Sequence, residues 1–149
     1  MRARLNKIGG ESGFTLIEVL VVVLIIGILA TIALPSFLNQ TTKSKDAAAE
    51  ALAQSAQIAA EAYATDNNGS YAGLTAGILY QYDATIQTAP GSGSAYILPV
   101  TNATATGYTV TAASEGGTST FSVQRTNGLI TRTCTPTGGV QGACVNGSW

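Results

Sequence analysis

The sequence predicts an α+β protein in which one long N-terminal helix packs against a small antiparallel β-sheet. Val19–Leu38 is an uncharged and mostly aliphatic run, and an alanine-rich stretch over residues 47–64 carries the helical pattern further. After residue 64 the chain is rich in Thr, Ser, Gly, Ala and Tyr. That composition suits short strands and turns better than long helices.

The apolar run is long enough to cross a membrane. Twenty residues without a charge span roughly 30 Å as a helix, which is the thickness of the hydrocarbon core. Arg2, Arg4 and Lys7 precede the run. By the positive-inside bias these basic residues predict a single-pass protein with a cytoplasmic N-terminus.

Three interpretations of this segment compete: a secretory signal peptide, a plain signal anchor, and a precursor that is cut before the apolar run. A secretory signal peptide has a shorter apolar region, with its cleavage site after it. A plain signal anchor fits the length and the flanking charge. Neither accounts for Glu18, a carboxylate at the edge of the run with no basic residue near it in the chain that follows. A charge at such a depth needs a partner.

A cut between Gly13 and Phe14 would supply that partner. It creates an α-amino group at Phe14, four residues before Glu18, and these two positions share one face of a helix. Amine and carboxylate would then each lower the other's cost of burial. The same carboxylate could also meet the amine of a neighbouring subunit.

These residues carry a resemblance. The segment Gly13-Phe14-Thr15-Leu16-Ile17-Glu18, followed by a long aliphatic run, resembles the class III signal sequence of type IV prepilins and pseudopilins. In that family a prepilin peptidase cuts after the Gly and methylates the new N-terminal Phe. The resemblance implies processing at Gly13 and Phe14, and an assembly role for Glu18.

Gly27 and Pro35 also fit the family, in which this part of the helix can lose regular structure in assembled filaments. Both residues have simpler interpretations. A proline in a transmembrane helix removes one backbone hydrogen bond and makes a kink. A glycine there lets two helices pack closely.

We expect three regions along the chain: a leader peptide at 1–13, a helix at 14–64 whose part 14–38 is membrane and filament core, and a sheet domain at 65–149. A predicted apolar stripe attaches the helix to the sheet; it consists of Ala48, Leu52, Ala56, Ala59 and Tyr63. The polar flanks of the stripe are Lys43, Lys45, Asp46, Glu50 and Glu61.

The C-terminal region predicts four strands. Asp66–Ser70 should stop the helix, and residues 71–93 read as irregular. The strand candidates are Ala95–Thr101, Tyr108–Ala113, Ser119–Thr126 and Leu129–Thr135. Pro99 restricts the first to an edge, and Asn127-Gly128 predicts a tight hairpin between the last two. This is also the architecture that the pilin resemblance implies.

Cys134 and Cys144 are the only cysteines. An even pair in a chain with an export signal indicates one disulfide, formed outside the cytoplasm, although two unlinked thiols stay an alternative. In pilins a C-terminal disulfide bounds an exposed, variable loop. The similar position here implies that residues 134–144 form such a loop.

The composition speaks against enzymes and metal sites. The chain has no His, which excludes Ser–His–Asp and Cys–His catalysis and makes zinc a poor expectation. We therefore expect no catalytic residue, no metal and no cofactor. Secretion pseudopilins bind calcium through acidic residues in C-terminal loops, whereas Glu115 is the only acidic residue here after Asp83. That departure favours a pilin.

The predicted function is therefore that of a structural subunit of a type IV pilus. The expected partners are other pilin subunits, the prepilin peptidase, the pilus assembly platform and the cytoplasmic membrane that holds the precursor. The mature chain would form an extracellular filament serving adhesion, twitching motility or DNA uptake. DNA itself is an open partner without support, because residues 14–149 have four basic against seven acidic side chains. The alternatives are a pseudopilin of a secretion or competence system, and a membrane-anchored binding module that does not polymerise.

Overall fold

The computed structural model describes residues 13–91, 93–135, 144 and 146–149. The chain divides into two compact units, Met1–Phe37 and Leu38–Trp149, and each is described by itself. Most of the expected leader, residues 1–12, lies outside the described residues. So do residues 136–143 of the expected C-terminal loop.

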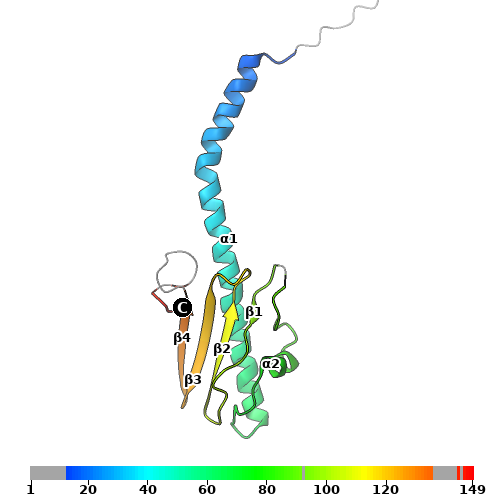
Figure 1. Ribbon diagram of the computed structural model, residues 1–149, viewed down its shortest axis with the longest axis vertical. Helices are drawn as coiled ribbons and strands as arrows, with labels where there is room; N and C mark the ends of the chain where they lie inside the picture. The colour runs from blue at the N-terminus through cyan, green and yellow to red at the C-terminus, as the bar shows by residue number, and fades with distance from the viewer. Residues whose placement is uncertain (1–12, 92, 136–143, 145) are drawn as a thin grey trace, which may run out of the picture. The chain divides into compact units, whose positions relative to one another are not determined.

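The long helix α1 runs from Leu16 to Asp66 (Figure 1), two residues later at each end than the predicted helix at 14–64. Pro35 lies inside it. Its C-terminal end is closed by a cap in which the Gly69 N–H donates to the Ala64 carbonyl at 2.7 Å. Asn68 and Gly69 both have positive φ, at 55° and 82°. Asn and Gly adopt that conformation at low cost, which explains why the helix stops here.

The second unit contains a four-stranded antiparallel sheet in the order β1-β2-β3-β4. The strands are β1 (Tyr96–Ile97), β2 (Gly107–Ala113), β3 (Thr120–Thr126) and β4 (Leu129–Thr135). Asn127 and Gly128 form the tight turn between β3 and β4, both with positive φ, as that hairpin requires. The last three strands were predicted to within a residue. The first was predicted too long, because it ends before Pro99 and has only two residues.

The prediction that residues 71–93 are irregular was wrong in one part. A short helix, α2, spans Ala76–Tyr82. The Thr75 side chain caps it by accepting a hydrogen bond from the Ile78 N–H at 3.2 Å. Leu79 is fully buried and fixes the helix to the core. Seven residues give too little periodicity to be recognised in sequence.

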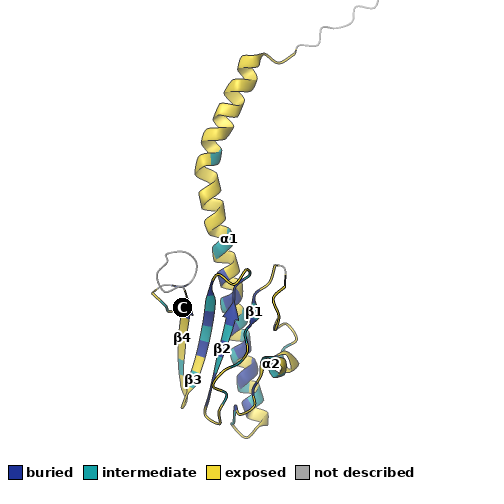
Figure 2. Ribbon diagram, in the orientation of Figure 1, coloured by how far each residue is buried: buried dark blue, intermediate teal, exposed yellow. Residues whose placement is uncertain are grey.

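The core of the second unit lies between α1 and one face of the sheet. On α1 the buried positions include Ala49, Ala53, Ala56 and Ala60, and Figure 2 shows buried bands on the part of α1 beside the sheet. From the strands come alternate residues, among them Tyr108, Val110, Phe121 and Val123. The sheet therefore has one buried face and one face turned to solvent.

The predicted burial of two residues on α1 was wrong. Ala48 was expected in the buried stripe, but it is exposed and Ala49 takes the buried place. Asp46 was expected on a polar flank and is instead only 1% exposed. Nearly every position of this segment is small and weakly apolar, so composition alone does not fix which side of the helix faces the sheet.

Candidate functional site

The N-terminal unit is an apolar helix with an open surface. Of its described residues, 13–37, all are exposed except Ala30, which is half-buried (Figure 2). Its most apolar 18-residue window has a mean hydropathy of 3.0 and no buried residue. By length and composition, α1 is the one helix in the described part of the chain able to cross a membrane. So large an apolar surface needs a cover of lipid or of other helices.

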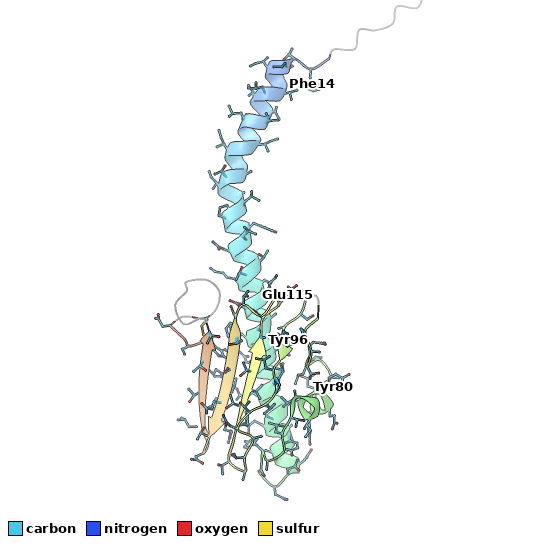
Figure 3. The ribbon with its side chains drawn as sticks, in the orientation of Figure 1. Phe14, Tyr80, Tyr96 and Glu115 are labelled. Carbon is cyan, nitrogen blue, oxygen red and sulfur yellow. A yellow bond between two sulfur atoms is a disulfide. The ribbon has the colours of Figure 1, made fainter. Side chains whose placement is uncertain are left out.

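The predicted processing pair, Gly13 and Phe14, precedes the first residue of α1. A Cβ atom added to Gly13 would meet nothing within 4 Å. Phe14 is 86% exposed, and Figure 3 labels its side chain at the start of the helix. The bond between them therefore lies in open, non-helical backbone that a peptidase could reach.

Glu18 closes a capping box with Thr15 at the beginning of α1. The Thr15 N–H donates to Glu18 Oε2 at 2.9 Å, and the Thr15 hydroxyl donates to the same oxygen at 2.8 Å. In return the Glu18 N–H donates to Thr15 Oγ1 at 3.3 Å. The exchange of hydrogen bonds between a Thr and a Glu three residues later satisfies backbone donors that a helix start leaves unpaired.

This capping box changes the interpretation of Glu18. Glu18 was expected to lack a partner until Phe14 has a free amine, but Thr15 already gives its carboxylate two hydrogen bonds. The Thr-x-x-Glu spacing was visible in the sequence and would have revealed this partner. Two roles for Glu18 must now be separated, helix capping and charge pairing.

Gly27 and Pro35 lie further along α1 than Glu18. The helix is regular at both residues. The Thr31 hydroxyl donates to the Gly27 carbonyl at 2.8 Å, while Pro35 has no N–H to offer the Thr31 carbonyl one turn back. A Cβ at Gly27 would meet nothing within 4 Å. In the subunit, therefore, steric room at Gly27 is not used.

The second unit is held together by a polar cluster around Glu61 that sequence analysis missed. Its carboxylate accepts hydrogen bonds from the hydroxyls of Tyr71 at 2.6 Å and Tyr108 at 3.1 Å, and it pairs with Arg125 at 2.9 Å. The Arg125 guanidinium also lies over the Tyr71 ring, 5.4 Å from its centroid. These contacts join α1, the following loop and two strands, and no short-range pattern encodes them.

The two tyrosines of this cluster titrate abnormally. Burial, together with the hydrogen bond to Glu61 and its negative charge, raises the pKa of Tyr71 to about 12. Burial and the charge of Glu61 raise the pKa of Tyr108 as well. The hydroxyls thus stay protonated donors in any physiological medium.

Asp46 is the structural anomaly of the second unit. Both of its carboxylate oxygens are buried and neither accepts a hydrogen bond from the described residues. Its neighbour in sequence, Lys45, pairs instead with Glu115 at 3.3 Å. An unpaired buried carboxylate costs free energy, so Asp46 weakens the fold in the isolated subunit.

The C-terminal end is fixed to β4 by covalent and polar contacts. Cys134 and Cys144 form a disulfide, with their Cα atoms 5.6 Å apart. The Cys134 N–H donates to the Gly147 carbonyl at 2.9 Å, and the Trp149 indole N–H donates to the Thr133 carbonyl at 2.9 Å. The Trp149 ring meets Phe121 edge-on. The tail is thereby held against the last strand.

No group of metal-ligating side chains occurs among the residues that the structure describes. The basic side chains of the described residues do not form a cluster. Lys45 and Arg125 are in ion pairs, and Arg132 donates to Gln57 at 3.0 Å and lies over the Trp149 ring. Figure 3 labels Glu115, the partner of Lys45, at the turn between β2 and β3.

Comparison with known proteins agrees with this arrangement. Residues 9–34 match the family described as "Prokaryotic N-terminal methylation motif". Residues 35–138 match the family described as "Type IV minor pilin ComP, DNA uptake sequence receptor". No solved structure matches the chain.

Two curated proteins are similar to it. The type IV wide pilus major component PilA4 of Thermus thermophilus is 31% identical over 126 residues, covering 80% of this chain and 91% of that protein. A fimbrial protein of Neisseria meningitidis serogroup B is 38% identical over 63 residues, 42% of this chain and 36% of that protein. An apolar N-terminal helix followed by an antiparallel sheet on its second half defines a filament subunit of the pilin class. The chain belongs to the type IV pilin family and is a structural subunit of a pilus.

Proposed function

We propose that this pilin is made as a membrane precursor with a cytoplasmic N-terminus, is cut between Gly13 and Phe14 by a prepilin peptidase, and is methylated at the new N-terminus. The assembly platform then adds the subunit to an extracellular filament. The observation that carries the proposal is the methylation motif over residues 9–34, whose Gly13–Phe14 bond lies in open backbone just before an exposed apolar helix.

The chemistry of polymerisation follows from the surface of that helix. Exposed aliphatic side chains leave lipid and pack on those of neighbouring subunits, so the apolar surface stays covered throughout. In such a core Glu18 lies away from water, where an ionised carboxylate needs a positive partner. The Phe14 amine of a neighbouring subunit supplies that charge, while Thr15 keeps the carboxylate oriented. A misplaced subunit leaves both charges unpaired.

Gly27 and Pro35 would allow α1 to lose regular helical structure during filament assembly. Pro35 leaves one carbonyl without its helical donor, and Gly27 adds conformational freedom about two turns earlier. Unwinding of the segment between them in the filament therefore costs little free energy. The open space at Gly27 equally admits a close helix from a neighbouring subunit.

A second candidate function, DNA uptake as a receptor, is favoured by the family matched over residues 35–138. Duplex binding depends on cations that neutralise phosphates. Here Lys45 and Arg125 each form an ion pair with a carboxylate, and Arg132 donates a hydrogen bond to Gln57. Among the described basic side chains, that leaves Lys43 to contact phosphates. These charges favour the structural role over the receptor role.

Shearing filaments from cells and probing them for this chain tests the proposal. Abundant filaments that contain the chain are expected. Little or no filament material, with the chain retained in the membrane, would instead support a pseudopilin or an anchored module. Purified filaments should bind duplex DNA weakly and without a steep salt dependence; tight binding that falls sharply with salt would show that the filament binds DNA and would contradict a purely structural role.

A further inference from the structure

Three charged side chains stand apart from all others in the described part of the chain, because they form no hydrogen bond and no ion pair: Lys43, Asp46 and Glu50. The remaining charged side chains of the described residues each have a polar or charged partner. All three lie within two turns of α1, at a spacing that places them along one side of the helix. Their partners are therefore to be sought outside the subunit.

The three charges cannot satisfy one another within one chain. Lys43 and Glu50 are seven residues apart, which is about 10 Å along the helix axis and too far for an ion pair. Lys43 and Asp46 are close in sequence, but Lys43 is exposed whereas Asp46 is only 1% exposed. Glu50 is half-buried and has the same charge as Asp46. Each subunit thus presents a cation and, further along the same side, an unpaired carboxylate.

The neighbouring solvent-facing surface of α1 has no charge of its own. Its residues are Ala47, Ala51, Gln54 and Ile58, all of them exposed. Ile58 has no cover over 71% of its surface. Exposed positions of a helix on a soluble unit are usually charged. A second helix can therefore approach this part of α1 closely without burying an unpaired charge there.

The partner must bring both a cation and an anion, which a second copy of this chain does. Nucleic acids and lipid headgroups offer phosphates to Lys43, but Asp46 and Glu50 would repel those phosphates. A parallel copy displaced by seven residues, about 10 Å along the axis, brings its Lys43 level with Glu50 of the first. The buried charge of Asp46, one turn from Glu50, adds to the attraction on that lysine.

We propose that Lys43 pairs with Glu50 of a neighbouring subunit and thereby fixes the axial step between parallel α1 helices in the filament. The contact is head-to-tail, so each subunit gives its lysine to one neighbour and receives the lysine of another. One such pair at a partly exposed position contributes little, but the pair repeats at every subunit. This inference rests on the proposed assembly into filaments.

Charge reversal in the full chain tests the pair. Lys43→Glu and Glu50→Lys each place like charges in contact, and each should lower the number of filaments seen by electron microscopy about tenfold or more. Lys43→Gln removes the attraction without adding repulsion, so its effect should be smaller. The double variant Lys43→Glu/Glu50→Lys should return to within about threefold of wild type. Because the two side chains do not meet in one subunit, such a rescue acts between subunits.

A direct readout comes from zero-length cross-linking of wild-type filaments with a carbodiimide. Mass spectrometry should find Lys43 joined to Glu50, and mixed isotope-labelled and unlabelled subunits should show that the two residues come from different chains. Absence of this cross-link from abundant filaments would overturn the inference.

Two controls separate the pair from general effects. Gln81→Glu and Gln81→Lys change the charge at an exposed position of α2 and should leave the filament number unchanged. A membrane immunoblot should show every variant present at the wild-type level. Undiminished filaments in both reversals, or a double variant no better than the singles, would contradict the pairing. A loss confined to Lys43→Glu would assign Lys43 to anionic lipid and would contradict it too. Absence of filaments in the wild type would instead overturn the proposed assembly, so the two failures are distinguishable.

Discussion

Glu61 and Arg125 are 64 residues apart in the sequence and form an ion pair of 2.9 Å that joins α1 to β3. Both side chains are only partly exposed, at 36% and 26%. The same carboxylate holds the hydroxyls of Tyr71 and Tyr108. Glu61 is therefore the polar centre about which the sheet is positioned on the helix.

Removing this carboxylate should destabilise the second unit. Glu61→Ala leaves Arg125 and two tyrosine hydroxyls without an acceptor, and we expect a loss of about 2 kcal/mol in the free energy of unfolding, because solvent reaches part of the pair. Glu50→Ala, on the same helix, is the matched control. Urea unfolding of the mature subunit in detergent measures both. Equal midpoints for the two variants would show that the cluster around Glu61 contributes nothing.

The cluster also predicts alkaline sensitivity. The pKa of Tyr71 is raised from about 10 in an unfolded chain to about 12 when folded. A raised folded pKa contributes stability that is fully present below about pH 10 and is lost as the pH rises through about 12. Tyr71→Phe should reduce the fall in urea midpoint between about pH 9 and 12, whereas Tyr80→Phe, at an exposed position of α2, should not. An unchanged pH dependence in Tyr71→Phe would contradict this.

Asp46 should be a position at which a substitution stabilises the subunit. Its buried carboxylate has no hydrogen-bond partner among the described residues, so Asp46→Ala removes an uncompensated charge and adds a good helix former. We expect a gain of about 1–2 kcal/mol in the free energy of unfolding, against no gain for Glu50→Ala. A loss of stability at Asp46 would mean that the carboxylate is satisfied by a contact in solution.

The two roles of Glu18 can be separated by choice of substitution. Glu18→Gln keeps the capping box, since Gln serves at that position, but removes the charge. Thr15→Val removes the cap and keeps the charge. If charge pairing with the Phe14 amine controls assembly, Glu18→Gln and Glu18→Ala should both insert and be cut yet yield few filaments, and Thr15→Val should still assemble. The count of filaments by electron microscopy, with a membrane immunoblot, decides it. Full assembly of Glu18→Gln would assign Glu18 to capping.

Much of the fold could be predicted from local patterns. The Asn127-Gly128 turn and the alternation in β2 and β3 located β2, β3 and β4 almost to the residue, because hairpins are encoded by short-range signals. The length of α1 followed from its apolar run and alanines. α2 escaped notice because its cap at Thr75 and its one buried anchor, Leu79, are too few to make a pattern.

The site was predictable only where residues adjacent in sequence act together. Gly13, Phe14 and Glu18 could be singled out from one short motif, and their roles stay predictions. The cluster of Glu61 with Arg125 depends on strand register and helix rotation, which composition does not determine. The burial of Asp46 was missed for the same reason, since one step around an alanine-rich helix exchanges buried and exposed positions.

Cleavage after Gly13 and assembly through the helix that follows are the two steps proposed for this chain. Mass spectrometry of the N-terminal peptide from sheared filaments is the sharpest test of both. We expect an N-terminus at Phe14 that carries one methyl group, and Gly13→Val should leave only uncut precursor in the membrane. Filaments whose subunits begin at Met1, or beyond the apolar run at residue 38, would contradict it.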